Sequence, residues 1–559
     1  MITFLSRRAG RAVAGPAGRT QTPVPRRPWW VWVLPFAVVL GVLLVRNAFI
    51  FSTPLYEDAD IGADSILIEQ ARRFTLLVGN YSREKFNHPG PAFLYVQSWG
   101  ESVFWAWLHV VPAAWNGQLI AMYALNALFA ALLVAVGYGW TRSLRGGLAV
   151  FAVVLVFAAV HPAAFSTDWM PYLYVLAYLA FLVAIASVAG GRTADLWIAA
   201  LAGWFCLHGH ACFLFFVPVL TACAVIALAW PRRRRLAAAL RRFAVRQRAA
   251  WVPAVVISVL FLVPIVAELV LHWPGNFGKY LGYGSSGQAG GHGLPQIIGY
   301  LLWFWWPRAH SLLAFWIACA AAGAAVWWCP RGRVRRCCAS LLAFNAVSTL
   351  LAFVYAAIGI DELSERYIEY FYWTAPAVML LIVVLAVTEA LAGVLPRVLP
   401  AIVSTARSQR LVAVIAACGV LAAGTAFAVA AQTQTNTLWV EPAKPHHTQM
   451  ATDPSLPAGV ATLSALAGGR PVVLRFAHNA WPSITGILVQ AERTGVPVCI
   501  PGTHWEFMMT SQFACTSGEL ARGRAFYLYA PPTRMPRWAH VVFRFNQATA
   551  TTLARQIAD

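Results

Sequence analysis

Long apolar runs separated by short polar segments make up most of the chain. A helix of about 20 apolar residues is long enough to cross a bilayer. The pattern predicts about eleven such spans, at residues 28–51, 118–140, 147–165, 170–190, 194–209, 211–230, 251–272, 310–329, 338–359, 371–394 and 411–431. The sequence therefore predicts a polytopic α-helical membrane protein, with a transmembrane domain over residues 28–431.

The N-terminal end of the chain departs from this pattern. Residues 1–27 are rich in Arg, Gly and Pro and have no hydrophobic periodicity, which predicts a disordered basic arm. The apolar run that starts at Pro28 is too long for the apolar core of a signal peptide and has no clear cleavage site. We therefore expect it to remain as a membrane anchor.

The C-terminal end departs from it as well. Beyond residue 432 the apolar spans stop, and strand-like segments alternate with helical ones near 482–494 and 547–558. This alternation predicts a small α/β domain over residues 432–559 with a partly parallel sheet. The strand-like segments are 472–476, 496–500, 524–529 and 540–545. Cys499 and Cys515 would form a disulfide in an oxidising compartment, and two free thiols are the alternative.

Composition and charge agree with a membrane protein and indicate its orientation. The chain is 60% hydrophobic and 11% charged, against roughly 25% charged residues in soluble domains. Its formal charge of +21 comes almost wholly from arginines. These fall in alternate loops, which the positive-inside rule places in the cytoplasm, and this distribution argues against nucleic-acid binding. The clusters are Arg142/Arg145, Arg192, Arg232–Arg235 with Arg241/Arg242, Arg331–Arg336 and Arg397–Arg410.

This topology puts the N-terminus in the cytoplasm and the C-terminal domain outside it. Residues 56–117, 273–309 and 360–370 then form outer loops, the second of them glycine-rich and flexible. The run that begins at Trp303 is expected to form an aromatic belt at the membrane surface.

The first outer loop, residues 56–117, is expected to hold two helices that lie in the membrane interface. Residues 62–78 are amphipathic, which suits such a helix. Residues 91–111 are apolar and contain Glu101. If they crossed the membrane, every later arginine cluster would change sides, so we expect a second interfacial helix.

Acidic residues open this loop directly after the first span. Asp58 and Asp60 could serve as a general base or as ligands of a divalent cation. The alternative is a solvated acidic turn that only ends the preceding helix. Asp64 suits the start of a helix, and Asp168 suits a helix cap in a later turn.

The loop then returns with the polar segment GNYSREKFNHPGP, residues 79–91. Arginine donates paired hydrogen bonds that suit phosphate, so Arg83 and His88 are candidates to bind a phosphate group. Pro89 and Pro91 fix a stiff corner, and Gly90 allows a close backbone approach. Arg72 and Arg73 are interpreted as interfacial anchors.

Other candidates lie at the outer ends of later spans. His208 and His210 could share a metal only if the helix ended between them, and capping or lining a polar cavity is the alternative. Glu268 lies near the outer end of its span. Arg366 could bind a lipid phosphate at the membrane face or form a surface pair with Glu365.

Together these features resemble the GT-C superfamily of integral-membrane glycosyltransferases, which use polyprenyl-phosphate sugars. The shared parts are a cytoplasmic N-terminus, one span, a long outer loop that opens with acidic residues (here Glu57-Asp58-Ala59-Asp60), further spans and an outer C-terminal domain. The segment GNYSREKFNHPGPAFLY also looks like a motif of actinobacterial-type members. Aminoarabinose and arabinofuranosyl transferases of the cell envelope are the nearest functional comparison.

The resemblance implies a glycosyltransferase at the outer face of the cytoplasmic membrane. Asp58 or Asp60 would be the catalytic base. The donor and its phosphate would be bound by Arg83, His88, Arg366, Tyr81 and Glu268. The acceptor would be an envelope glycan or lipid. No cofactor is implied, although a divalent cation at the carboxylates stays open. A transporter or flippase of a lipid-linked glycan and a non-enzymatic envelope scaffold are the alternatives.

Overall fold

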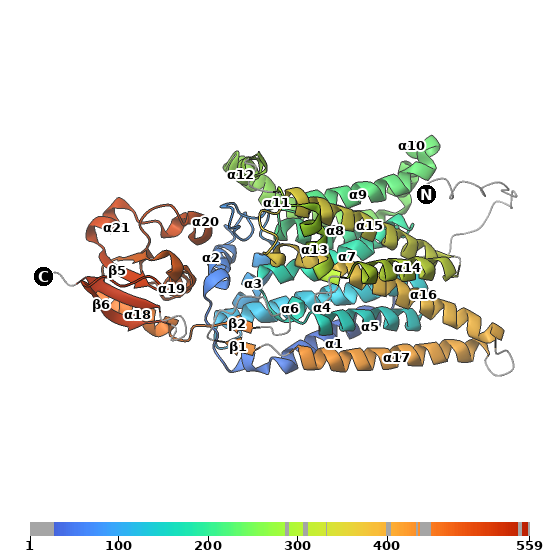
Figure 1. Ribbon diagram of the computed structural model, residues 1–559, viewed down its shortest axis with the longest axis horizontal. Helices are drawn as coiled ribbons and strands as arrows, with labels where there is room; N and C mark the ends of the chain where they lie inside the picture. The colour runs from blue at the N-terminus through green and yellow to red at the C-terminus, as the bar shows by residue number, and fades with distance from the viewer. Residues whose placement is uncertain are drawn as a thin grey trace.

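The structure is a computed structural model that describes residues 27–285, 290–305, 311–330, 332–398, 404–431, 434–436, 449–545 and 551–556. Figure 1 shows an elongated bundle of helices with a smaller domain at one end. The predicted basic arm lies outside the described residues except for Arg27.

Each predicted span coincides with one helix of the bundle. These helices are α1 (Trp30–Arg46), α4 (Ala114–Thr141), α5 (Leu144–Val160), α7 (Met170–Ala189), α8 (Leu196–Gly209), α9 (Phe213–Ala229), α11 (Arg248–Leu271), α14 (Leu312–Trp328), α15 (Arg333–Ile358), α16 (Thr374–Val398) and α17 (Thr405–Ala430). Within the described ranges, seven helices are long and apolar enough to cross a membrane, and α1, α5 and α14 are shorter apolar helices. The prediction of a polytopic helical membrane protein is confirmed.

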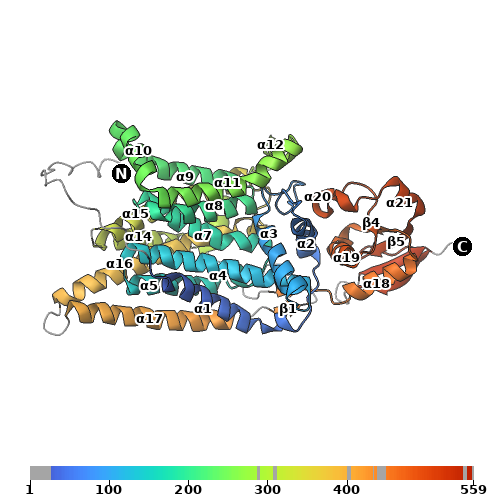
Figure 2. The same ribbon diagram turned by 180° about the vertical axis from the view of Figure 1, so that it is seen from behind.

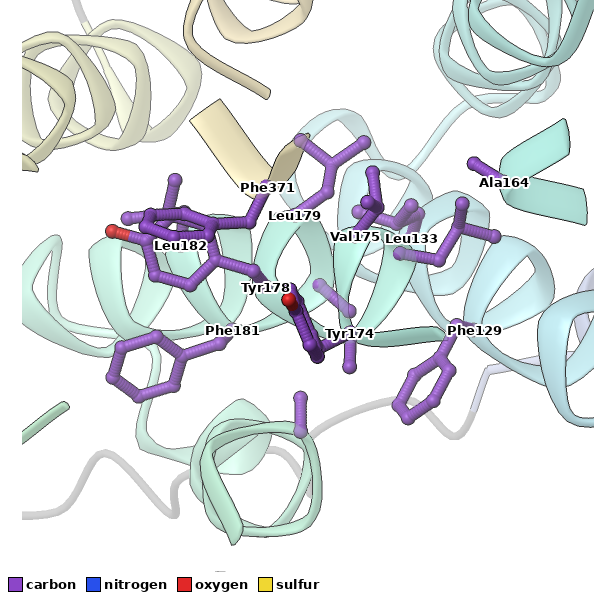
Figure 3. Close-up of a cluster of buried hydrophobic side chains, with 14 of the residues drawn as sticks. Phe129, Leu133, Ala164, Tyr174, Val175, Tyr178, Leu179, Phe181, Leu182 and Phe371 are labelled. Carbon is purple, nitrogen blue, oxygen red and sulfur yellow. The ribbon is translucent and has the colours of Figure 1, made fainter. Parts of the chain in front are cut away.

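Helix α7 forms the centre of the bundle. Figure 3 shows Tyr174 and Tyr178 of α7 among side chains from neighbouring elements, including Phe129 of α4. Phe371, from the 3₁₀ segment Arg366–Trp373, packs against Tyr178 with ring centroids 5.1 Å apart. In contrast, α11 and α17 expose apolar side chains along the outside of the bundle, as expected of helices that face lipid.

The arginine-rich connections gather at the end of the bundle away from the C-terminal domain. There Arg27 pairs with Asp195, and Arg145 pairs with Glu389 at 3.1 Å. Both views show α10 (Leu236–Arg246), which carries part of the basic sequence, at this same end (Figures 1 and 2). The arginine-rich loops and the predicted outer loops therefore lie at opposite ends of the bundle, as the pattern predicts. Which end faces the cytoplasm stays a prediction.

The described parts of the second outer loop, residues 273–285 and 290–305, are more ordered than the sequence indicated. They include α12 (Gly275–Ser285) and α13 (Leu294–Trp305). The prediction of a flexible loop with an interfacial aromatic belt is wrong over α13. Its side chains Tyr300, Trp303 and Phe304 are buried in the bundle core, and this burial stabilises the short helix.

The C-terminal domain is the small α/β domain that the sequence predicts. Its five-stranded sheet has the order β4-β3-β5-β7-β6. Strands β4 (Val498–Cys499), β3 (Val472–Phe476) and β5 (Arg524–Tyr529) are parallel, while β7 (Thr552–Gln556) and β6 (Ala539–Arg544) complete it in antiparallel fashion.

Helices surround this sheet, and a second pair of strands precedes it. The helices are α18 (Leu456–Ala467), α19 (Trp481–Thr494), α20 (Glu506–Met509) and α21 (Ser517–Arg522), and the short parallel pair is β1 (Gln434–Asn436) and β2 (Gln449–Ala451).

Two predictions for the C-terminal domain can be compared with its structure. The helix predicted near 547–558 is wrong, because residues 552–556 form β7 between β5 and β6. Cys499 and Cys515 form a disulfide.

The first loop contains α2 (Ala59–Arg72) and α3 (Ala92–Gly100), which continues into a π-helical turn at Glu101–Trp107. α2 does not lie at a lipid surface as predicted. Ala63 and Ile66 belong to the core of the C-terminal domain, whereas Leu67 and Ile68 belong to the core of the bundle. Both apolar sides of α2 are thus buried, and the helix joins the two parts of the molecule.

Candidate functional site

A cavity of about 1200 Å³ opens where the bundle meets the C-terminal domain. Its walls come from α2, the loop 80–88, the start of α7, the turn between α8 and α9, α12, the end of α15 and residues 361–370. Trp481, Phe507 and Met508 of the C-terminal domain complete it. The polar loop singled out in the sequence therefore lines a cavity.

Asp60 lies in the first turn of α2 and is partly exposed to this cavity. The Tyr81 hydroxyl donates a hydrogen bond to Oδ1 of Asp60, and the Trp169 Nε1–H donates one to Oδ2 at 2.8 Å. Burial raises the pKa of Asp60 above its ordinary 3.8, against the lowering effect of these two hydrogen bonds. A carboxylate with a raised pKa and a fixed orientation is suited to take a proton from a bound hydroxyl group.

Asp58 occupies a different environment from Asp60. It precedes α2, is buried, and does not line the cavity. Burial, and then the negative charges of Asp453, Asp60 and Glu57, raise the pKa of Asp58 to about 7. Its carboxyl group is thus turned away from the space in which a substrate would lie.

Asp64 is a second carboxyl group of α2 in the cavity wall. The expectation that it starts a helix is wrong, because it lies one turn beyond Asp60 within α2. Its Oδ1 has no hydrogen-bond partner in the part of the chain that the structure describes. Burial, and then the charges of Asp60 and Asp168, raise the pKa of Asp64 well above 3.8. Asp60 therefore ionises first, because two donors stabilise its anion.

The loop 79–90 holds its shape through its own backbone. The N–H of Gly79 donates to the carbonyl of His88 at 2.8 Å, and the N–H of His88 donates to the carbonyl of Asn80 at 2.8 Å. Gly90 packs against the imidazole of His208, where any side chain would clash with the ring. The predicted stiff corner with a close backbone approach is confirmed.

His88 and His210 line the cavity side by side, with ring centroids 4.3 Å apart. Their Nδ1 atoms accept the N–H groups of Ala211 and Cys212, each at 3.2 Å. Burial lowers the pKa of His210 to about 4, and burial with the neighbouring His210 lowers the pKa of His88 well below 6.5. Both rings are therefore neutral at pH 7 and present Nε2–H as a donor. His88 therefore offers a phosphate group a neutral donor and not a positive charge.

His208 lies behind the cavity wall. Its Nδ1 accepts the N–H of Ala92 at 3.2 Å, and its Nε2 donates to the carbonyl of Phe261 at 3.0 Å. Both nitrogens are thus engaged, and His208 has no lone pair to share a metal with His210. The described residues contain no group of three His, Cys, Asp or Glu side chains that could hold a metal ion.

Glu268 is also outside the cavity wall. Its Oε1 accepts the N–H of Asn276 at 3.2 Å, and the side chain of Asn276 in turn accepts the N–H of Asn87 at 3.1 Å. Glu268 therefore supports α12 and the polar loop rather than contacting a ligand in the cavity.

The two candidate arginines at the cavity mouth are in opposite situations. Arg83 pairs with Asp361 and lies 4.0 Å from Glu365 and 3.6 Å from Glu84, so its charge is already neutralised. Arg366 lies over the ring of Trp303, with its guanidinium carbon 4.7 Å from the centroid. Among the described residues, no carboxylate lies within ion-pair distance of Arg366, and the alternative of a pair with Glu365 is not formed. Arg366 is therefore the cation available to an anionic ligand.

A buried ion network fixes the C-terminal domain beside the cavity. The guanidinium of Arg493, on α19, pairs with Glu57 at 2.8 Å, Glu69 at 2.8 Å and Glu101 at 3.2 Å. Burial works against its charge, but the carboxylates of Glu101, Glu57 and Glu69 prevail and raise the pKa of Arg493. A buried arginine with three carboxylate partners anchors α19 to α2 and α3.

Two arginines that were expected to be lipid anchors belong to the same interface. Arg72 pairs with Glu69 at 3.1 Å and with Glu101 at 2.9 Å, and Arg73 pairs with Glu492 of α19 at 2.6 Å. Arg72 thus joins α2 to the π-helical turn, and Arg73 joins α2 to the C-terminal domain. Both arginines have carboxylate partners within the protein, in place of the lipid contacts that the anchor interpretation assumed.

Sequence reasoning missed Trp169 and Arg493, and it gave Asp64 a helix-start role instead of a place in the cavity wall. The spacing of Asp60 and Asp64 was a usable signal, because residues four apart share a helix face. Glu101, a charge within an apolar segment, indicated a buried partner. Nothing in the sequence identified that partner as Arg493, which lies 392 residues away.

Comparison with solved structures identifies the fold. The chain superposes on the crystal structure of ArnT from Cupriavidus metallidurans bound to undecaprenyl phosphate with a TM-score of 0.50 and 16% identity, covering 95% of this chain and 99% of that chain. The apo state of the same protein matches with a TM-score of 0.53 and 13% identity, covering 94% and 97%. The chain has the GT-C fold.

This GT-C fold is shown by structure and not by sequence. No protein family and no curated protein matches the sequence of the chain. The Archaeoglobus fulgidus oligosaccharyltransferase also aligns, over 89% of this chain and 68% of that chain, with 10% identity and a TM-score of 0.36, too low for a closer comparison.

Proposed function

We propose that this GT-C protein is a membrane glycosyltransferase that moves a sugar from a polyprenyl-phosphate donor to an envelope acceptor. The observation that carries the proposal is the cavity. It presents a partly buried carboxylate, Asp60, held by Tyr81 and Trp169. It also presents a cation, Arg366, that has no ion pair among the described residues. Sugar transfer from a lipid phosphate requires a base for the acceptor and a positive charge for the leaving group.

Asp60 is the base in this proposal. Its carboxylate takes the proton of the acceptor hydroxyl while the hydroxyl oxygen attacks the anomeric carbon and the bond to the phosphate oxygen breaks. The raised pKa makes Asp60 a stronger base than an exposed aspartate. Base assistance of this kind contributes about 10²–10⁴-fold in rate. Asp58 is not proposed for this role, because it does not line the cavity.

Arg366 binds the phosphate group that departs with the lipid. Its planar guanidinium offers paired donors to phosphate oxygens, and it stabilises the negative charge that grows as the bond breaks. The Nε2–H groups of His88 and His210 add neutral donors in the cavity wall. Tyr81 orients Asp60, and Arg83 holds the loop around Asp361, so neither binds phosphate directly.

The cavity also suits a lipid chain. Leu214 and Phe215 of α9 and Ile358 of α15 line it and are 38%, 39% and 68% exposed on the bundle. These apolar side chains connect the cavity to the lipid-facing surface of the helices, where a polyprenyl chain would lie. The match to a protein solved with undecaprenyl phosphate supports this donor class.

Two features support placement of the site outside the cytoplasm. The arginine-rich loops lie at the opposite end of the bundle, where the positive-inside rule places the cytoplasm. The Cys499–Cys515 disulfide lies in the domain beside the site, and disulfides persist in oxidising compartments. A site at one end of the bundle favours surface chemistry over the passage of a glycan through the membrane.

The proposal is tested with purified protein in liposomes that contain undecaprenyl phosphate carrying a radiolabelled sugar. Delipidated envelope fractions from the organism that encodes the chain serve as acceptors. We expect labelled sugar to appear in the acceptor fraction with the wild-type protein and not with Asp60→Asn. Movement of intact labelled donor between leaflets, without transfer, would instead identify a flippase and refute the proposal.

A further inference from the structure

A row of aromatic rings leads from the cavity onto the surface of the C-terminal domain. It begins at Tyr81, whose hydroxyl is bonded to Asp60. The ring of Tyr81 contacts Phe507 at a centroid distance of 6.1 Å, and Phe507 stacks on Trp505 at 6.1 Å with an interplanar angle of 20°. Trp505 continues the row to His478, at 5.3 Å.

The rings of this row are accessible. Tyr81, Phe507 and Trp505 are half-buried, and His478 is exposed. His504, also exposed, lies against Trp505 at 5.6 Å. The row thus offers flat apolar ring faces, with polar ring atoms on Tyr81, Trp505 and His478.

The segment that carries Phe507 and Trp505 is fixed in place. The Cys499–Cys515 disulfide joins the two ends of the loop that contains this segment. Within this loop, the N–H of Ile500 donates to the carbonyl of Phe513 at 2.7 Å, and the N–H of Cys515 donates to the carbonyl of Ile500 at 3.0 Å. Figure 1 shows α20, which contains Phe507, on the side of the domain that faces the helix bundle. The rings are therefore ordered before any ligand arrives.

This combination matches the chemistry of an uncharged oligosaccharide. A sugar ring has an apolar face of C–H groups and a rim of hydroxyl groups. Rigid aromatic side chains provide a large contact area at small conformational cost and still allow hydrogen bonds at their edges. The arginines suited to a lipid phosphate, Arg83 and Arg366, lie in the cavity wall and are not part of the row.

We propose that the row Tyr81–Phe507–Trp505–His478 binds the acceptor as a neutral oligosaccharide, with its reacting end beside Asp60 and its further sugars stacked along the C-terminal domain. The inference rests on the proposed glycosyltransferase function. It adds the acceptor class and assigns the C-terminal domain to acceptor binding.

The test measures binding of neutral oligosaccharides of two to eight sugars, released from the envelope of the organism that encodes the chain. Saturation-transfer NMR on the full chain in detergent reports the sugars in contact with protein. We expect wild-type binding to weaken at least tenfold in Trp505→Ala and in Phe507→Ala, and Trp505→Tyr to retain most of it. Trp538→Ala is the matched control, because Trp538 is 40% exposed on the same domain and outside the row.

Each outcome decides the inference. No binding by the wild type, or unchanged binding by Trp505→Ala, overturns it. Folding of each variant is checked by the thiol content of the Cys499–Cys515 pair under denaturing conditions and by thermal melting. Oligosaccharide binding without any sugar transfer would refute the proposed function and leave the binding row standing.

Discussion

The indole Nε1–H of Trp169 donates a 2.8 Å hydrogen bond to Oδ2 of Asp60, joining the start of α7 to α2. The bond stabilises the ionised carboxylate, whereas burial favours the protonated form. The balance of these two effects sets the pH at which Asp60 becomes a base.

Removal of this hydrogen bond should shift the acidic limb of the pH–rate profile. In Trp169→Phe the Asp60 anion loses a donor, so its pKa rises further and activity is lost at a higher pH than in the wild type. A hydrogen bond to a charged group contributes about 1.5–3 kcal/mol, which corresponds to a shift of roughly one to two pH units. Trp204→Phe is the matched control, because Trp204 donates an equal 2.8 Å bond to Ser258 away from the cavity. An acidic limb that stays in place in Trp169→Phe would disprove this role.

Arg366→Gln should weaken use of the lipid donor. It removes a cavity-lining cation that has no ion pair among the described residues. Hydrogen bonds to charged groups contribute about 1.5–3 kcal/mol, so kcat/KM for the donor should fall roughly 10- to 100-fold. Arg366→Lys should recover part of this loss, because it keeps the charge without the paired donors. Lys279→Gln, an exposed cation of α12 outside the cavity wall, should have no effect. Equal donor kinetics in Arg366→Gln and the wild type would exclude phosphate binding there.

Arg493→Met should loosen the C-terminal domain. It leaves Glu57, Glu69 and Glu101 buried without their main partner, and breaking a buried network of this kind costs about 3–5 kcal/mol. The measurement is the rate of limited proteolysis between α17 and α18, together with the melting temperature. Arg73→Met is the control at the same interface, because Arg73 is 58% exposed and its pair should contribute about 1 kcal/mol or less. Similar proteolysis of both variants would contradict the anchoring role of Arg493.

How far the sequence predicts this structure depends on the range of the interactions involved. The spans follow from local apolar runs, and the candidate base follows from its place after the first span. The sequence does not separate Asp58 from Asp60, because both are near the start of α2 and only tertiary packing turns one towards a cavity.

Other features depend entirely on distant partners. Ile66 and Ile68 lie two residues apart and enter different cores, that of the C-terminal domain and that of the bundle. The amphipathic pattern of α2 predicts one side that faces lipid, but that side packs against the C-terminal domain. Residues 552–556 form a strand because β5 and β6 flank them. Arg493 and Glu57 are 436 positions apart, and no local pattern relates them.

Asp58→Asn should make the protein more stable at neutral pH. The pKa of Asp58 is raised to about 7 by burial first and by Asp453, Asp60 and Glu57 next, so the stability it contributes is fully present below about pH 4 and is lost as the pH rises through about 7. Asparagine removes this loss. We expect a gain of about 1–3 kcal/mol at pH 8 and little change at pH 4, measured by thermal unfolding in detergent. A variant less stable than the wild type at pH 8 would contradict the assigned burial of a carboxylate.

The most direct test compares Asp60→Asn with Asp58→Asn in single-turnover transfer from an undecaprenyl-phosphate sugar. Both remove one carboxylate from the same turn, but only Asp60 lines the cavity. If Asp60 is the base, Asp60→Asn lowers the rate of transfer about 10²–10⁴-fold with donor binding unchanged, while Asp58→Asn stays within a few-fold of the wild type. A wild-type rate in Asp60→Asn would contradict the account.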